Sequence, residues 1–165
     1  MREESTAYGI AWARGGSEEV IRTALFHLLE TGQACRDEVF TPGRPVQPAF
    51  RVAPGRRAPG HGITRAVWSY LDGGAHPAAL IEHQGLRTLI DAGCSRMARH
   101  ESFAKTGRES VELLKVAKGG TRILIGTAWE SFHRALESGK RYVEPGSRPS
   151  AWERFLWSIG IWGGG

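Results

Sequence analysis

The clearest hydrophobic pattern in the chain begins after Ser17. Apolar residues recur there at helical spacing, at Val20, Ile21, Ala24, Leu25, Leu28 and Leu29. Ser17 can cap the first amides, and the two glutamates that follow it lie in the first turn, where the helix dipole favours negative charge. Thr31-Gly32 ends the pattern. We therefore expect an amphipathic helix over residues 17–31, with His27 as a structural histidine between its core positions.

Three further segments have helical character. A second long helix is expected from His76-Pro77 to about residue 101, because proline is favoured in a first turn and apolar residues recur through Met97. Gly85 and Gly93 weaken this helix or permit close packing. Residues 129–138 are expected to form a helix that Gly139 ends. Residues 63–71 fit either a strand or a short helix.

A β-hairpin is expected over residues 109–127. Two β-capable runs, 109–116 and 121–127, flank Lys118-Gly119-Gly120, which has the composition of a tight turn. The second run is almost continuously apolar at Ile123-Leu124-Ile125, as in a strand buried on both faces. This hairpin would supply the sheet of the domain.

These elements predict one α+β domain over residues 1–165, with two long helices packed on a small antiparallel sheet. Residues 1–16 are interpreted as an N-terminal arm, in which 8–13 could form a short strand. Residues 41–62 are rich in proline, glycine and arginine, so we expect a long extended basic loop, either ordered on another surface or flexible. Within this loop only residues 49–52 could form a short strand. Residues 150–165 make an aromatic C-terminal segment.

The positive charge of the chain is concentrated in and around this loop. The net charge is +5, and no acidic residue stands between Glu38 and Asp72. Five arginines fall in that interval: Arg44, Arg51, Arg56, Arg57 and Arg65. A clustered positive segment indicates an anionic partner, although a solvated basic loop has the same composition. In the C-terminal segment, Trp152, Phe155 and Trp157 are expected to dock on the domain or on a partner subunit.

No pattern in the sequence indicates catalysis, a metal or a cofactor. Cys35 and Cys94 have no metal-ligand spacing, and free buried thiols fit a reducing compartment. His76 and His83 could share a helix face but lack the close pairing of zinc sites. Glu112 and Lys115 are one residue too far apart for the E-x-K arrangement of a nuclease strand. There is no phosphate-binding glycine loop and no nucleophile elbow, so we expect a protein that is not an enzyme.

Targeting and membrane signals are also missing from the pattern. The first residues lack the apolar core of a signal peptide, and no apolar run reaches the roughly 18 residues of a membrane span. We therefore expect a soluble intracellular protein with no membrane partner.

Four short motifs in the second half of the chain stand in a recognisable order. They are Thr106-Gly107-Arg108, Ile125-Gly126-Thr127, Leu136-Glu137-Ser138-Gly139 and Arg148-Pro149. In this order, after a basic helix, they resemble the tail-completion or head–tail connector (neck) proteins of tailed bacteriophages, mainly over residues 76–155. Ser150-Ala151 replace the aromatic residue that the family has after Arg-Pro, and residues 1–75 have no counterpart.

The resemblance implies a structural role in a phage-like particle. The protein would form an oligomeric ring that joins the head or portal to the tail, with other virion proteins as partners, in the virion or the host cytoplasm. The arginines would then meet acidic partner surfaces or DNA phosphates. The alternative is a basic nucleic-acid-binding module, in which Phe50 and Trp68 could stack on bases, or a small nuclease.

Overall fold

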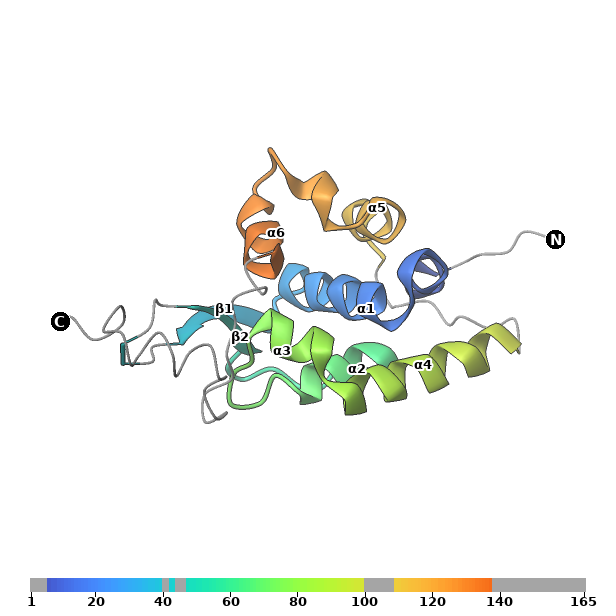
Figure 1. The fold of residues 1–165 in the computed structure, drawn as a ribbon, viewed down its shortest axis with the longest axis horizontal. Helices are drawn as coiled ribbons and strands as arrows, with labels where there is room; N and C mark the ends of the chain where they lie inside the picture. Colours follow the sequence, from blue (N-terminus) through green and yellow to red (C-terminus); the bar gives the residue numbers. More distant parts are fainter. Residues whose placement is uncertain (1–5, 40–41, 44–46, 100–108, 138–165) are drawn as a thin grey trace, which may run out of the picture.

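The computed structural model of the protein describes residues 6–39, 42–43, 47–99 and 109–137 (Figure 1). Helices and one pair of strands alternate along these residues. The elements are α1 (Ala7–Glu30), β1 (Ala34–Val39), β2 (Gln47–Val52), α2 (Gly62–Ser69), α3 (Pro77–Glu82), α4 (Gln84–Arg99), α5 (Val111–Gly119), the 3-10 helix η1 (Thr121–Leu124) and α6 (Glu130–Glu137). The α+β class expected from the sequence is confirmed, and a small antiparallel sheet is present, although β1 and β2 form it rather than residues 109–127.

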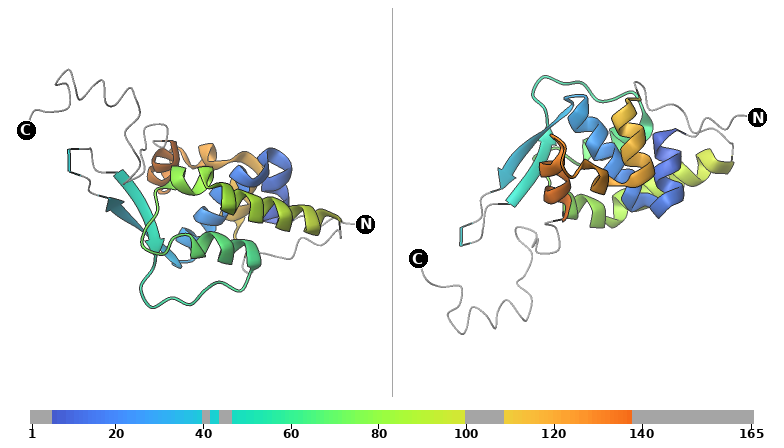
Figure 2. Two further views of the ribbon diagram at one scale, coloured as in Figure 1. Left: turned by 60° about the horizontal axis from the view of Figure 1, so that its bottom comes forward. Right: turned by 90° about the horizontal axis from the view of Figure 1, so that it is seen from above.

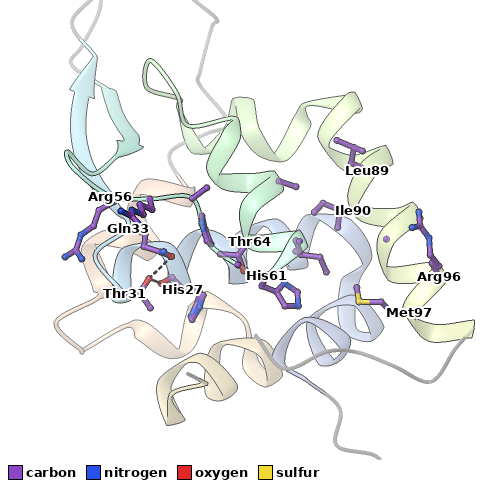
Figure 3. A pocket seen from close by; sticks show the side chains of 18 of the residues that line it. His27, Thr31, Gln33, Arg56, His61, Thr64, Leu89, Ile90, Arg96 and Met97 are labelled. Atoms are coloured by element: carbon purple, nitrogen blue, oxygen red, sulfur yellow. Dashed lines mark hydrogen bonds between the residues drawn. The ribbon is translucent and has the colours of Figure 1, made fainter. Parts of the chain in front are cut away.

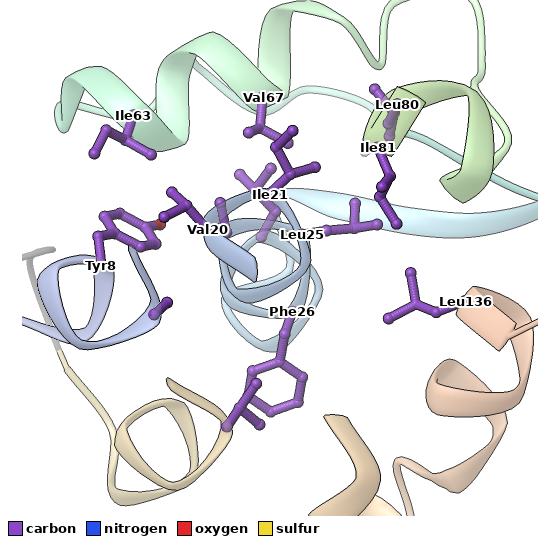
Figure 4. Close-up of a cluster of buried hydrophobic side chains, with 14 of the residues drawn as sticks. Tyr8, Val20, Ile21, Leu25, Phe26, Ile63, Val67, Leu80, Ile81 and Leu136 are labelled. Atoms are coloured by element: carbon purple, nitrogen blue, oxygen red, sulfur yellow. The ribbon is translucent and has the colours of Figure 1, made fainter. Parts of the chain in front are cut away.

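Helix α1 is the centre of the fold. The helices α2, α3 and α4 lie on one side of it and α5, η1 and α6 on the other (Figure 1). Its side chains therefore point into the core in nearly every direction (Figure 4). Ile21 and Leu25 pack toward α2 and α3, while Phe26 packs edge-on against Trp129, with ring centroids 5.1 Å apart. A helix that is apolar around most of its circumference is stable only when it is surrounded in this way.

The C-terminal end of α1 forms where the sequence predicts it. Gly32 has a positive φ of 68°, and its N–H donates to the Leu29 carbonyl at 3.1 Å. The N–H of Gln33 donates to the Leu28 carbonyl at 2.9 Å. This pair of bonds is the Schellman motif, which requires a residue that tolerates a left-handed conformation. It turns the chain from α1 directly into β1.

The sheet consists of β1 and β2, which pair antiparallel and project from one end of the helical body (Figure 2). Ala34 lies opposite Val52, and Arg36 lies opposite Phe50. Phe50 is fully buried and also exchanges two backbone hydrogen bonds with Ala75, each 2.8 Å long. The short strand expected at residues 49–52 is thereby confirmed, whereas β1 was not expected.

The β-hairpin expected over residues 109–127 is wrong. Residues 111–119 form helix α5, because the Ser110 hydroxyl accepts a hydrogen bond from the Leu113 N–H at 3.0 Å and so caps a helix there. Leu113, Val116 and Ala117 then bury one helical face against α1. Residues 121–124 form η1, in which Leu124 is buried while Ile123 on one side of it is 38% exposed. The residues expected in a buried strand therefore belong to a turn region.

Two other expectations need correction. Residues 7–14 are helical rather than an arm or short strand, and they are joined to the rest of α1 across a break at Gly15 and Gly16. The second long helix is divided at His83, whose extended backbone separates α3 from α4. Residues 62–69 form helix α2, one of the two alternatives that the sequence left open, and the helix expected over 129–138 is confirmed as α6.

Candidate functional site

An open groove of about 1240 Å³ runs along one side of the helical body, and we call it the basic groove (Figure 3). Four parts of the chain form it: the C-terminal end of α1, the segment between β2 and α2, the start of α2 and one face of α4. The residues that line it include His27, Thr31, Gln33, Arg56, Arg57, Gly60, His61, Gly62, Ile63, Thr64, Leu89, Ile90, Gly93, Arg96 and Met97. Two of the arginines that the sequence marked, Arg56 and Arg57, are among them.

The charge of the groove lining is entirely positive. Arg56, Arg57 and Arg96 are exposed, and no aspartate or glutamate is among the lining residues that the structure describes. None of the ion pairs formed within the described ranges involves these three arginines. Walls that carry one sign of charge raise the local concentration of ions of the opposite sign. The groove is therefore suited to an anion.

Arg56 is placed by the end of α1. Its guanidinium lies over Gly32, so that a Cβ built there would be only 3.5 Å from Nη2. The backbone carbonyls at a helix C-terminus carry partial negative charge, which favours a cation beside them. Arg56 therefore lies beside the end of α1 at the groove edge, and none of the ion pairs within the described residues neutralises it.

The loop that carries Arg56 and Arg57 is fastened to α2. The Arg65 Nε donates to the Pro59 carbonyl at 2.9 Å, and Pro59 itself is buried. Arg65 is thus a support of the groove rather than part of its lining. The start of α2 also opens on the groove, where no side chain caps the helix and Gly60 and Gly62 leave open space. The helix dipole adds positive potential at this point.

Thr64, which lines the groove, makes an ordered polar contact with the buried Tyr8. The Tyr8 hydroxyl and the Thr64 hydroxyl are 2.7 Å apart, and the Tyr8 ring lies against His61 with centroids 5.2 Å apart. Burial raises the pKa of Tyr8 well above its ordinary value, so its hydroxyl stays protonated. His27 and His61 both line the groove (Figure 3).

Helix α4 forms a mixed wall. Leu89, Gly93, Arg96 and Met97 follow one another at helical spacing on the groove side. Leu89 is 56% exposed, whereas Leu86, Ile90 and Cys94 on the adjoining face are buried. Burial raises the pKa of the Cys94 thiol to about 12. The wall thus carries an exposed apolar residue and a cation about two turns apart.

The other residues marked by the sequence are not brought to this site. The Arg51 guanidinium pairs with the Asp37 carboxylate across the sheet at 2.8 Å. Phe50 is fully buried and Trp68 does not line the groove, so neither can stack on a base there. Arg44, Trp152, Phe155 and Trp157 lie outside the described residues.

Sequence reasoning missed the part of the groove that α4 contributes. Arg96 and Leu89 both fall within the second long helix expected from the sequence, and neither was singled out as a binding residue. Their spacing of seven residues, or about two helical turns, was the available signal that they share a face. The spacing alone gives no reason to associate them with a loop some thirty residues earlier.

The residues considered for metal binding or nuclease chemistry have other roles. His76 accepts a hydrogen bond from the Ala78 N–H at 3.1 Å and so caps α3, and the His83 ring packs on Tyr70 at 4.7 Å. Glu112 and Lys115 form an ion pair of 3.1 Å on helix α5 instead of lying on a strand. Among the described residues, no three His, Cys, Asp or Glu side chains converge as metal ligands would.

The helices within residues 6–39, 47–99 and 109–137 are all too short or too polar to cross a membrane. Comparison with protein family models, curated proteins and solved structures yields no match for the chain.

Proposed function

We propose that the protein binds nucleic acid in the basic groove, mainly through phosphate contacts. The observation that carries this proposal is the set of three exposed arginines, Arg56, Arg57 and Arg96, which line one groove with no carboxylate among its described lining. A guanidinium presents a planar set of donors that matches the oxygens of a phosphate. Binding of this kind requires no catalytic group.

The size of the groove favours a polymer over a small anion. Pockets for small molecules occupy roughly 300–1,000 Å³ and enclose most of the ligand. The groove, at about 1240 Å³, is larger and open to solvent. Arg56 and Arg96 also lie toward opposite ends of it (Figure 3). A single phosphate would contact one end, whereas a chain of phosphates can contact both.

The test is the affinity of the full chain for fluorescently labelled DNA and RNA, measured by polarisation over a range of salt. Changing Arg56 and Arg57 together to glutamate should weaken binding by at least about tenfold at low salt. The slope of log Kd against log salt should also fall by about two, one for each lost phosphate contact.

The matched control is the double change Lys118→Glu and Arg122→Glu. Both residues are exposed, and they lie on the opposite side of α1, at the end of α5 and in η1. The net-charge change is the same in the two double variants. Equal loss of binding in both would show a response to net charge alone and would contradict a groove. Unchanged binding of the first variant would refute the proposal.

A connector ring is the second candidate function. It rests on the resemblance of the motifs and on one structural observation, the exposure of large apolar side chains on the side of the fold away from the groove. Val111 is 68% exposed and Ile125 is 58% exposed. Exposed apolar surface favours contact between subunits. Light scattering followed by negative-stain imaging tests this candidate, because a ring is a discrete large species and a monomer at every concentration argues against it.

A further inference from the structure

We propose that the basic groove selects single-stranded nucleic acid over duplex, because the α4 wall contacts exposed bases. The inference rests on the proposed function and adds the class of nucleic acid to it. It is carried by Leu89, Gly93 and Met97, which place apolar and open surface beside Arg96 in the same groove.

Leu89 is an exposed apolar residue of the α4 wall. Leu89 leaves 56% of its surface in solvent although it stands on the same helix as buried Leu86 and Ile90. A single exposed leucine needs no explanation on its own. Leu89, however, lies inside the groove, where half-buried Met97 and buried Ile63 and Ile90 provide further apolar lining. A ligand that offered only phosphates would leave this apolar surface without a counterpart.

Open space lies beside Leu89 on the α4 wall. Gly93 stands one turn after Leu89, and a Cβ built on it would meet no atom within 4 Å. The wall is therefore recessed between Leu89 and Arg96. The stretch from Leu89 to Met97 extends about 12 Å along the helix axis, at 1.5 Å for each residue. A recess between an apolar side chain and a cation fits a flat apolar group that is attached to an anionic backbone.

Duplex and single-stranded nucleic acid present different surfaces to the groove. In a duplex the flat faces of the bases are stacked on one another, so a groove wall meets only phosphates, sugars and base edges. In a single strand the base faces are available to protein side chains, while the phosphates still meet cations. Leu89 and Met97 can therefore contribute only to single-strand binding, and the three arginines contribute to both.

The groove should also be tolerant of sequence. Its described lining contains no Phe, Tyr or Trp, and its aromatic rings are those of His27 and His61. Every base has a flat face, so apolar contact with that face does not depend on the identity of the base. Stacking on aromatic side chains tolerates sequence for the same reason. We therefore expect little difference among homopolymers of the same length.

Three probes separate the contributions. They are an oligothymidylate of about twelve nucleotides, which is within the site sizes known for single-strand binding, an abasic oligomer of the same length, and a duplex of the same length. The abasic oligomer keeps the phosphates and lacks the bases. The unaltered protein should bind oligothymidylate more tightly than either of the other two probes.

The decisive variant is Leu89→Gln, which keeps a good helix former at an exposed position. It should weaken oligothymidylate binding by about fivefold, which corresponds to the loss of about one buried apolar contact, and should leave abasic binding unchanged. Val111→Gln is the matched control, since Val111 is an exposed apolar residue on α5, away from the groove. The control should bind all three probes as the unaltered protein does.

A second variant, Gly93→Leu, places a side chain in the recess, where its Cβ would meet no atom within 4 Å, and should also weaken binding of oligothymidylate more than binding of the abasic oligomer. The inference is overturned if Leu89→Gln weakens binding of oligothymidylate and of the abasic oligomer equally. It is also overturned if the unaltered protein binds the duplex as tightly as oligothymidylate. The glutamate variant of Arg56 and Arg57 separates this failure from that of the proposed function. If that variant loses affinity for all three probes while Leu89→Gln keeps its affinity for each of them, the proposed phosphate binding stands and single-strand selection does not.

Discussion

Replacing Gly93 by alanine should stabilise the protein, although Gly93 lines the candidate site. Gly93 lies in the interior of α4, where glycine has no structural requirement: its φ is not positive, and a Cβ would meet no atom within 4 Å. Glycine in a helix interior is less favourable than alanine because the unfolded chain loses more backbone freedom on folding. The added methyl group reduces that loss and displaces no neighbour.

The magnitude follows from the helix propensity alone. Glycine is less favourable than alanine by about 0.8–1 kcal/mol in a helix interior. No strain opposes this gain at Gly93, so the free energy of unfolding of Gly93→Ala should rise by about 1 kcal/mol. For a chain of about this size, a change of 1 kcal/mol moves Tm by about 2–4 °C. Urea unfolding should show a higher midpoint with an unchanged slope, which means that the change lies in stability alone.

Gly85→Ala provides the matched control in the same helix. A Cβ at Gly85 would lie 3.1 Å from His83 Cε1 and 3.4 Å from the Tyr70 hydroxyl. His83 and Tyr70 are packed ring on ring, and His83 Nδ1 accepts a hydrogen bond from the Leu86 N–H at 3.2 Å. The alanine must displace this arrangement, so its gain should be smaller or reversed. Equal stabilisation by both substitutions, or destabilisation by Gly93→Ala, would refute the reasoning.

Two further predictions concern buried titratable groups. Burial lowers the pKa of His76 to about 4 from 6.5, so the unfolded chain takes up the proton first and stability should fall as the pH decreases from about 6.5 to about 4. His76→Asn keeps an acceptor for the Ala78 N–H and should remove this part of the acid sensitivity, which urea unfolding at pH 7 and pH 5 measures. Cys94 is fully buried and Cys35 is partly exposed, so a thiol reagent followed by mass spectrometry should label Cys35 in the native protein and Cys94 only after unfolding. Native labelling of Cys94 would contradict its burial.

The elements that could be predicted are those in which the local signals agree with the packing. In α1 the apolar spacing of residues 20–29, the two glutamates after Ser17 and Thr31-Gly32 all indicate the same helical segment, and the fold surrounds it. The Schellman motif at Gly32 depends only on residues within two turns of it. Such an end can be found in the sequence because no distant contact decides it.

The hairpin prediction failed because two local signals disagreed. Val111, Val116 and Ile123–Ile125 have β-branched or apolar side chains and surround two glycines, which is typical of strands about a turn. Ser110 three residues before Leu113, followed by the spacing of Leu113, Val116 and Ala117, is equally typical of a capped helix. The neighbouring α1 decides between them, since it offers an apolar surface that a helix of this length can cover.

Strand β1 was missed for a related reason. Its sequence, Ala34-Cys35-Arg36-Asp37-Glu38-Val39, contains three charged residues in succession and lacks the usual alternation. It forms because the turn at Gly32 directs the chain back and β2 lies within hydrogen-bonding distance. Residues 36–38 remain exposed, so the sheet accommodates their charge at its surface. The pairing, rather than the composition of the strand, determines its structure.

The basic groove shows why charge in a sequence identifies a surface only in part. The interval between Glu38 and Asp72 has no acidic residue and contains five arginines, yet the four that the structure describes separate in the fold. Arg51 is paired on the sheet, Arg65 fastens the loop, and only Arg56 and Arg57 among those described reach the groove. The third arginine comes from α4, a helix whose basic residues are partly balanced by an acidic residue of its own sequence. A binding surface depends on which charges remain without a carboxylate after folding. That selection is made by α1 and α2, which position the loop at the groove that α4 also lines. Because Leu89 and Gly93 belong to this wall, the same packing that assembles the charge also places apolar surface beside it.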